Sequence, residues 1–191
     1  MEYEKERIFS GEKVFTKRLV VARLQSSDWS FFKALAGDIE VRKYFKEYRK
    51  GSKKLKKYFL EEIVGKQDKY TLSLVIRNRD EVPIGIIRMD YLKDGIWLVE
   101  YALLDFYRKN GYVKEVLNYI IQNNYEFLLT FKASNVSMNG LVFEVPDDNL
   151  MSSNLIKGIA RENRLYLETS KSSFYSEFDS KSGWTWQRIY L

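Results

Sequence analysis

The sequence predicts a single α+β domain built around a mixed β-sheet, and three observations support this fold class. First, apolar residues recur with the period of a helix in some segments and alternate or run together in others, so both kinds of element are expected. Second, Asp94-Gly95 lies between two apolar runs, which is typical of a β-hairpin and therefore of antiparallel pairing. Third, the helical segments fall before and after a group of strands instead of alternating regularly with them, which is the order of an α+β plan.

The first part of the chain is predicted to contain one strand, two helices and a three-stranded meander. Strands are expected where Val, Leu, Ile and Thr are concentrated, and helices where apolar residues recur after a capping residue such as Ser or Asp. The expected elements are a strand over residues 14–24, a helix that follows Ser27-Asp28 and ends at Gly37-Asp38, a helix from Ser52 to Gly65, and strands over residues 70–76, 84–92 and 96–104.

In the second part of the chain, helices are interspersed with shorter strands. The segment that begins at Tyr112 has the amphipathic pattern of a helix of about four turns that buries one face. The later elements are expected to be a strand over residues 141–145, a helix from residues 147–149 to about Glu162, and closing strands over residues 165–168 and 186–191, with a polar loop or hairpin tip over residues 170–183.

The amino-acid composition excludes several classes of catalytic and metal site. The 191 residues suffice for one domain with a buried core, and neither a linker nor a repeat marks a second domain. Because the chain has no cysteine and no histidine, disulfides, thiolate metal sites and Ser-His-Asp chemistry cannot occur. An enzyme of this composition must use carboxylates, hydroxyls, lysines, tyrosines or backbone groups. A cytoplasmic location is expected, since neither a signal-peptide core nor an apolar run of roughly 18 residues is present.

The net charge of +6 either favours an anionic partner or serves solubility alone. Positive charge is concentrated in residues 46–57, where Tyr48 and the neighbouring Tyr58 are interleaved with basic side chains. Such a segment is either a solvated helix face or a surface for an anion such as RNA. Its basic residues are Lys46, Arg49, Lys50, Lys53, Lys54, Lys56 and Lys57.

The junction between the third strand of the meander and the helix that follows is the strongest candidate for a binding site. A buried strand ends near Leu104, and a short basic loop with Arg108 and Lys109 opens the helix at Tyr112. Helix N-termini present unpaired N–H groups and a positive dipole end, so they bind phosphate well. Gly111 would let the backbone approach a ligand closely. An ordinary strand-to-helix loop with solvated basic residues remains the alternative.

Several short strings, taken in order, resemble those of a known enzyme family. They are residues 14–24, Pro83-Ile84-Gly85, Glu100-Tyr101-Ala102-Leu103, residues 108–116, Asp148-Asn149-Leu150-Met151-Ser152 and residues 183–188. Residues 108–116 are similar to the motif R-G-x-G-Y-A-x-E-A. In order and spacing the strings resemble the GNAT superfamily of N-acetyltransferases, in its RimJ/RimL-like group, which acetylates ribosomal-protein N-termini. The resemblance covers residues 14–191 and implies a mixed, mostly antiparallel sheet flanked by about four helices.

The resemblance implies acetyl-CoA as co-substrate, no metal, and a primary amine as acceptor, on a peptide N-terminus, an amino sugar or a small molecule. The pantetheine arm would pair with the backbone of Leu103 and Leu104 like an added strand. The amide of Asn149 would hold the same arm. The implied pyrophosphate site consists of Arg108, Lys109 and the N–H groups of Asn110, Gly111, Tyr112 and Val113.

The resemblance also implies two catalytic residues. Ser152 would stabilise or protonate the departing thiolate, and Glu100 is the best candidate for the base that leaves the attacking amine neutral. Asp90 and Glu144, on neighbouring strands, are weaker candidates. Each residue also has a structural alternative, because Glu100 could be a surface or ion-paired carboxylate, and Asn149 with Ser152 could simply cap a helix.

The sequence departs from the family pattern at several positions, including Ala160-Arg161 in place of the usual Gly-Phe and an insertion-like stretch over residues 132–140. Lys109 stands where the loop usually has its first glycine, and Val113 where it usually has alanine. Ile156 stands where many members place a tyrosine general acid, so that acid is not available there. The alternative function is therefore a diverged scaffold that binds CoA, RNA or a protein partner through its basic surface. Family members often dimerise, so a homodimer is a further expectation.

Overall fold

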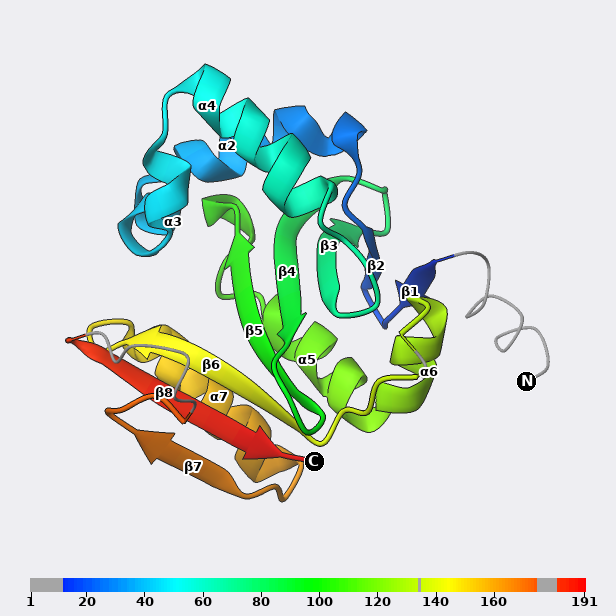
Figure 1. Ribbon diagram of the computed structural model, residues 1–191, viewed down its shortest axis with the longest axis vertical. Coiled ribbons are helices and arrows are strands. Elements are labelled where there is room, and N and C mark those ends of the chain that lie inside the picture. The colour runs from blue at the N-terminus through cyan, green and yellow to red at the C-terminus, as the bar shows by residue number, and fades with distance from the viewer. Residues whose placement is uncertain (1–11, 134, 175–181) are drawn as a thin grey trace.

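The computed structural model describes residues 12–133, 135–174 and 182–191. The described strands form one eight-stranded sheet: β1 (Lys13–Phe15), β2 (Leu19–Arg23), β3 (Thr71–Asn78), β4 (Pro83–Tyr91), β5 (Ile96–Leu103), β6 (Gly140–Pro146), β7 (Leu167–Ser170) and β8 (Trp184–Tyr190). Their order in the sheet is β1-β2-β3-β4-β5-β6-β8-β7 (Figure 1). Only the β5–β6 pair is parallel among these strands, which confirms the mixed, mostly antiparallel sheet.

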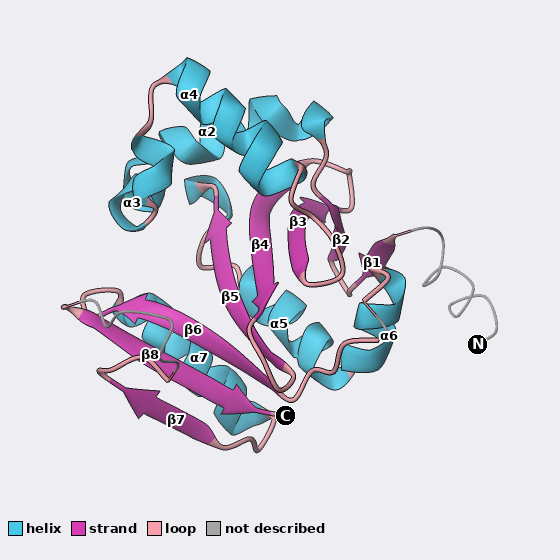
Figure 2. Cartoon of the chain, in the orientation of Figure 1, coloured by secondary structure: helices cyan, strands magenta, loops and turns pink. Residues whose placement is uncertain are grey.

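Helices cover both faces of the sheet (Figure 2). One face packs on α5, α6 and α7, with bounds Tyr112–Gln122, Asn124–Thr130 and Leu150–Glu162. The other packs on α2 (Trp29–Gly37), α3 (Ile39–Tyr44) and α4 (Ser52–Tyr58). Short 3-10 segments lie at Ser26–Asp28, Lys46–Arg49 and Asp105–Tyr107, and a π-helical turn at Phe59–Val64 extends α4. None of the helices in the described ranges is long and apolar enough to cross a bilayer.

The strand pattern explains why the sheet has two buried faces. In β3, Leu74 and Ile76 face the α5–α7 side while Val75 faces the α2–α4 side, because successive side chains on a strand point to opposite faces. On the α5–α7 side the fully buried rings include Trp97 and Phe143. A β-strand covered on both faces is accordingly apolar along its length.

The first predicted strand, over residues 14–24, is wrong in one respect, because it is a hairpin of β1 and β2. The turn is stabilised locally by Thr16, whose Oγ1 accepts a hydrogen bond from the N–H of Leu19 at 3.2 Å. It is also held from a distance by Glu115 of α5, which accepts hydrogen bonds from the Thr16 hydroxyl and the Arg18 N–H at 2.6 and 2.7 Å. Sequence periodicity cannot predict this contact, because Glu115 lies far from the turn along the chain.

The helix predictions are confirmed in place and differ in detail. The N-cap of α4 is Gly51 and not Ser52. Asp28 occupies the N-cap position of α2, but its side chain does not cap that helix. The carboxylate pairs with Arg77 and accepts from the N–H of Gln25, which caps the 3-10 segment Ser26–Asp28. The predicted four-turn helix from Tyr112 is shorter and is followed by α6. Helices α3 and α6 were not predicted, so the expected count of about four is too low. The predicted 170–183 loop lies partly outside the described residues.

The parallel join between β5 and β6 is short. Its register covers Ile96–Leu98 against Gly140–Val142, and beyond it the two strands diverge (Figure 1). Strand β5 continues to pair with β4 as far as Leu103. In the described chain, therefore, the edge of β5 from Val99 to Leu103 pairs with β4 on one side and has no strand in register on the other. We call this break in strand pairing the β5–β6 gap.

Candidate active site

Alternation along β5 decides which backbone groups face the β5–β6 gap. The N–H of Leu104 donates to the carbonyl of Ile84 at 3.0 Å, so the backbone groups of the even-numbered residues point toward β4. Those of Tyr101 and Leu103 therefore point into the gap. Leu103 thus presents its backbone to the gap, whereas the N–H of Leu104 is already engaged. Tyr101, which sequence reasoning had not assigned, presents its backbone in place of Leu104.

Gly85, from the predicted Pro83-Ile84-Gly85 string, allows the end of β5 to lie close to β4. A Cβ atom at this position would lie 2.2 Å from the side chain of Leu103 and 2.6 Å from the carbonyl oxygen of Ala102. Contacts this short do not occur between real atoms, so any larger residue at position 85 would move the gap-facing end of β5. The glycine therefore positions the candidate site.

The loop between β5 and α5 has the form expected of a phosphate-binding loop. Gly111 is the N-cap of α5 with φ +75°, and Lys109 has φ +61°. The first hydrogen bond of the helix is donated by Glu115 to Gly111, so the N–H groups of Tyr112 and Val113 precede the helical ladder. Around Gly111 the space is open: an added Cβ would meet only an Arg18 nitrogen, at 3.7 Å. This geometry fits a phosphate group.

Arg108, which is predicted to bind the pyrophosphate, is already engaged by two carboxylates and a carbonyl oxygen. Its Nη2 forms an ion pair with Asp38 at 2.5 Å, its Nη1 one with Asp105 at 3.1 Å, and its Nε donates to the carbonyl of Leu103 at 3.1 Å. The side chain is only 19% exposed. Arg108 therefore ties the end of β5 and its loop to the start of α3.

Asp38 is held at this position by several groups. It accepts hydrogen bonds from the N–H groups of Glu40 and Val41 at 2.9 and 3.2 Å, and so caps α3. Burial raises the pKa of Asp38, but the hydrogen bond from Arg108 and those two backbone bonds together outweigh burial, so the pKa lies below its ordinary value. The carboxylate is thus ionised at neutral pH and neutralises Arg108.

Arg18 is the cation that the structure brings to the α5 N-terminus. Its Nε pairs with the carboxylate of Glu115 at 2.6 Å, and its guanidinium lies 4.6 Å above the ring of Tyr112. An Nη atom lies 3.7 Å from the Cβ position of Gly111. Arg18 comes from the β1–β2 turn, so distance along the chain concealed it from sequence reasoning. The only signal was its place in the first family-like string.

Asn149 and Ser152 lie together at the start of α7, across the gap from β5. The side-chain oxygen of Asn149 accepts from the N–H of Ser152 at 3.1 Å, so the helix-capping alternative is correct. Capping uses the oxygen of the amide and leaves its NH₂ group for another acceptor. The hydroxyl of Ser152 lies 2.5 Å from that of Tyr101. Burial raises the pKa of Tyr101 to about 12, with a smaller opposing effect of the Ser152 bond.

Glu100 lies on the other face of β5, toward α2 and α4. It stands opposite Arg88 in the β4–β5 register, and Arg88 pairs with Asp90 at 2.9 Å. Burial is the main cause of the raised pKa values of Tyr48 and Tyr58, about 12 for Tyr58, and the charge of Glu100 adds to both. The carboxylate of Glu100, the guanidinium of Arg88 and the phenols of two tyrosines therefore lie near one another on this side of β5.

Four other residues singled out in the sequence are either buried in the core, as Val113 and Ile156 are, or placed on the loop and the sheet, as Asn110 and Glu144 are. Val113 is buried in the core, so the bulkier side chain replaces alanine without occupying the phosphate loop. Ile156 is fully buried on α7, and no tyrosine hydroxyl is available there. Asn110 donates from its side chain to the carbonyl of Arg108 at 2.9 Å, which fixes the loop. Glu144 lies on β6 two residues after Val142, whose side chain packs with Leu98, so it faces the same side as Glu100.

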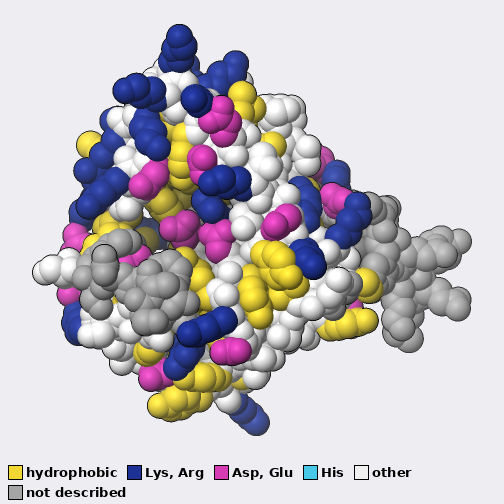
Figure 3. All heavy atoms as spheres, in the orientation of Figure 1, with side chains coloured by type: hydrophobic (Ala, Val, Ile, Leu, Met, Phe, Trp, Pro, Cys, Tyr) yellow, Lys and Arg dark blue, Asp and Glu magenta, His cyan; other side chains and the backbone are white. Residues whose placement is uncertain are grey.

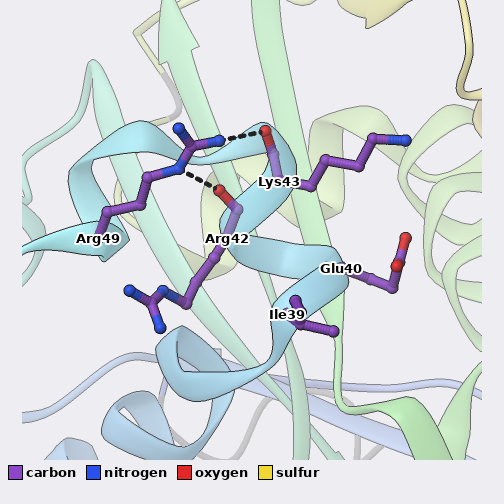
Figure 4. A pocket seen from close by; sticks show the side chains of 5 residues that line it. All are labelled: Ile39, Glu40, Arg42, Lys43 and Arg49. Carbon is purple, nitrogen blue, oxygen red and sulfur yellow. Dashed lines mark hydrogen bonds between the residues drawn. The ribbon is translucent and has the colours of Figure 1, made fainter.

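The basic segment consists of the 3-10 segment Lys46–Arg49 and most of α4, in the part of the molecule where Figure 3 shows Lys and Arg side chains along the edge. Arg49 donates to the carbonyls of Arg42 and Lys43 at 2.7 and 2.9 Å, beside a shallow pocket of about 310 Å³ that Ile39 and Glu40 also line (Figure 4). This cation is therefore used to close the C-terminus of α3. The observation favours a structural role for Arg49 over anion binding.

A second contact of the same region reaches the rim of the gap. Lys43 of α3 pairs with Asp148, just before the N-cap of α7, at 2.7 Å. Together with the Arg108–Asp38 pair, it places α3 beside the C-terminal ends of both β5 and β6, on the two sides of the gap. The candidate site is thus bordered by the α5 N-terminus, the α7 N-terminus and α3.

Comparison with known proteins identifies the family of the chain. The sequence pattern of the Acetyltransferase (GNAT) domain family matches residues 18–159. No curated protein sequence matches the chain. Several solved structures share the fold. An acetyltransferase (GNAT family) from Bacillus anthracis is 13% identical with a TM-score of 0.68, covering 94% of this chain and 97% of that one.

Two further structures were solved with coenzyme A. A spermidine N-acetyltransferase from Vibrio cholerae, in complex with CoA and spermine, is 13% identical with a TM-score of 0.64, covering 91% of this chain and 94% of that one. RimL, a ribosomal L7/L12 α-N-protein acetyltransferase in complex with CoA, is 14% identical with a TM-score of 0.67, covering 92% and 96%. At these identities the structures show a shared fold, while the domain match covers most of the chain. The chain therefore belongs to the acetyltransferase (GNAT) family and is an acyl-CoA-dependent N-acyltransferase with acetyl-CoA as its co-substrate.

Proposed function

We propose that this protein transfers the acetyl group of acetyl-CoA to a primary amine by direct attack in the β5–β6 gap. The observation that carries the proposal is the gap itself, an unpaired strand edge with the α5 N-terminus at its mouth and two hydroxyls across it. An extended pantetheine arm can pair with such an edge as a β-strand would. The N–H groups of α5 then lie where a pyrophosphate is needed.

Each part of acetyl-CoA has candidate partners in the chain. The pyrophosphate is assigned to the N–H groups of residues 110–113, with Arg18 in place of Arg108 as the nearby cation. The pantetheine arm is assigned to the backbone of Tyr101, the N–H of Leu103 and the amide of Asn149, since the carbonyl of Leu103 already accepts from Arg108. The thioester then lies beside Ser152.

The two faces of β5 separate the two proton transfers of the reaction. The amine approaches from the α2–α4 side, where Glu100 accepts a proton, directly or through water, so that a neutral nitrogen attacks the thioester carbon. Backbone N–H groups at the end of β5 stabilise the oxyanion. When the carbon–sulfur bond breaks, the electron pair stays on sulfur, and the hydroxyl of Ser152 stabilises the thiolate until it is protonated. The net result is an amide, CoA with a free thiol, and no net change in the enzyme.

The acceptor is a primary amine on a peptide N-terminus, an amino sugar or a small molecule. Spermidine and the N-terminus of a ribosomal protein are substrates of the two CoA-bound structural relatives, which makes them the first candidates. A panel of spermidine, glucosamine and N-terminal peptides, including one of L7/L12 sequence, would compare these classes. Acceptor-dependent release of thiol is a direct signal, because the chain itself has no cysteine.

The test has a binding step and a turnover step. Calorimetry with acetyl-CoA should give a one-site isotherm, and saturating acetyl-CoA should raise Tm, because a ligand that binds only the folded state stabilises it. Glu100→Gln should lower kcat by roughly 10²- to 10⁴-fold for a lost proton transfer. Ser152→Ala should lower kcat by about tenfold for a lost hydrogen bond to the thiolate, and neither variant should change acetyl-CoA affinity much. Glu162→Gln, at the far end of α7, is the matched control. A protein that binds no acetyl-CoA would contradict the proposal.

A further inference from the structure

Two hydroxyl groups meet across the β5–β6 gap, where the sheet itself is open. Tyr101 lies on β5, three residues beyond Leu98, the last residue in register with β6. Ser152 lies in the first turn of α7, the helix that follows β6. Their oxygens are 2.5 Å apart. The hydroxyl pair therefore connects one side of the gap to the other.

Each partner is held in place independently of this hydrogen bond. The ring of Tyr101 packs edge-on against Phe143, with centroids 6.5 Å apart and planes at 69°. The backbone of Ser152 is fixed by its N–H bond to Asn149. The short oxygen–oxygen distance thus follows from two separate anchors, one in the sheet and one at the helix cap.

A count of hydrogens shows what the pair can offer to a third group. Each hydroxyl carries one hydrogen, and the bond between them uses one, so one hydrogen remains for another acceptor. Burial keeps Tyr101 in its neutral form at physiological pH. The phenol hydrogen stays close to the plane of its ring, whereas the serine hydrogen rotates about the Cβ–Oγ bond. When Tyr101 donates to Ser152, the serine hydrogen is therefore free to turn toward an atom in the gap.

We propose that Tyr101 is a positioning residue that orients the Ser152 hydroxyl as hydrogen-bond donor to the sulfur of CoA. This inference rests on the function proposed above. As the carbon–sulfur bond breaks, the Ser152 hydrogen bond stabilises the negative charge on sulfur. The proton lost by the amine nitrogen finally resides on sulfur, and both hydroxyls remain neutral. With Ile156 buried further along α7, this arrangement supplies a hydroxyl donor from the sheet and the helix together.

The test uses CoA itself, so that no acceptor needs to be known. CoA labelled with ¹³C at the methylene next to sulfur is bound to the protein, and its chemical shift is followed with pH to obtain the pKa of the bound thiol. A hydrogen bond to the thiolate lowers this pKa. Ser152→Ala is expected to raise the thiol pKa by about one unit, a tenfold weaker stabilisation of the thiolate. Tyr101→Phe should raise it by part of that amount.

The double variant separates positioning from an independent effect. If Tyr101 acts through Ser152, Tyr101→Phe in the Ser152→Ala background should cause no further shift. Tyr119→Phe on α5, which packs against the same core cluster, is the matched control and should leave the thiol pKa unchanged. Melting temperatures verify that every variant is folded at the temperature of the titration.

The outcomes distinguish the two proposals. If the wild-type protein binds no CoA, both fail. If it binds CoA and Tyr101→Phe has the same bound-thiol pKa as Tyr119→Phe, only the positioning role of Tyr101 is overturned. Full additivity of the Tyr101 and Ser152 shifts would also overturn it, because the two hydroxyls would then act separately.

Discussion

Lys109 adopts a backbone conformation that glycine adopts more readily. Its φ of +61° lies in the left-handed region, where the Cβ of any other residue approaches the following carbonyl oxygen. The family-like motif has glycine at this position. The loop therefore keeps the expected shape although the residue has changed, and the cost is local strain instead of a different fold.

We expect Lys109→Gly to stabilise the protein by up to about 1 kcal/mol, since relief of the strain exceeds the entropy that glycine loses on folding. The free energy of unfolding in urea measures this change. Lys109→Ala, which removes the charge and keeps the strain, is the control and should not stabilise. If both variants had the same free energy of unfolding, the stability change would be due to loss of the Lys109 charge and not to relief of backbone strain.

Arg18 provides a second prediction for a single residue. Arg18→Ala should weaken CoA binding by roughly 10- to 100-fold, because one or two charge-assisted hydrogen bonds to phosphate are lost. Calorimetry with CoA, 3′-dephospho-CoA and pantetheine identifies the phosphate involved, and pantetheine affinity should be unchanged. Glu115→Gln removes the partner of Arg18 but keeps the cation, so it should weaken binding far less. An Arg18→Ala protein with wild-type affinity for CoA would exclude this role.

Among the helices, α3 is the one that organises the site, and the sequence did not predict it. Its first turn depends on Asp38, which the sequence pattern assigns to the end of the preceding helix. Asp38 in turn holds Arg108, seventy positions further along the chain. Local signals such as caps and periodicity predict the ends of most elements. They do not reveal an ion pair between residues that are distant in sequence. For this reason the sequence indicates phosphate, and not Asp38, as the partner of Arg108.

Variants of Asp38 should separate its two roles. Asp38→Asn keeps a capping oxygen but leaves Arg108 with less charge compensation. It should lower the free energy of unfolding by about 1–2 kcal/mol. Asp38→Ala also removes the cap and should cost about 1 kcal/mol more. The exposed Asp105, the other partner of Arg108, supplies the control, and Asp105→Asn should cost under about 0.5 kcal/mol. Urea unfolding measures all three, and equal losses at positions 38 and 105 would contradict this account.

The alternating direction of the backbone groups along β5 predicts that CoA binding slows hydrogen exchange at alternate amides. The N–H groups of Tyr101 and Leu103 face the gap, whereas those of Ala102 and Leu104 face β4. Saturating CoA should therefore slow exchange at Tyr101 and Leu103 and leave Ala102 and Leu104 nearly unchanged, since these are protected already. Exchange measured by NMR with and without CoA tests this. Uniform protection of all four amides would indicate general stabilisation and not pairing with the arm.

At the scale of the whole molecule, the fold class was predictable and the first hairpin was not. The meander, the Asp94-Gly95 turn and the later helices each have a local signal, and together they define the α+β plan. The β1–β2 turn depends on Glu115, which lies 99 residues from Thr16. The pairing of Tyr101 with Ser152 likewise depends on the divergence of two strands. Such long-range contacts follow from the fold and not from any one segment.

The link between the β1–β2 turn and Glu115 of α5 should appear in the pH dependence of stability. Burial raises the pKa of Glu115, but the hydrogen bonds from Thr16 and Arg18 together outweigh it, so the pKa lies below its ordinary 4.5. The contribution of Glu115 is therefore complete above pH 4.5 and is lost as pH falls through the folded-state pKa. The stability difference between wild type and Glu115→Gln should be largest near pH 6 and shrink toward pH 3. Urea unfolding across this range measures it, and a constant difference would contradict it.

The short join between β5 and β6 means that strand pairing contributes little to holding the two parts of the sheet together, and the core shared by α5 and α7 contributes more. The chain from β1 to α6 carries one part of the sheet, and the chain from β6 to β8 carries the rest with α7, so a cut in the α6–β6 connection would separate two polypeptides that each hold neighbouring strands. Three register pairs alone connect them within the described sheet. Because the proposed binding mode places acetyl-CoA against both parts, bound acetyl-CoA is expected to strengthen their association.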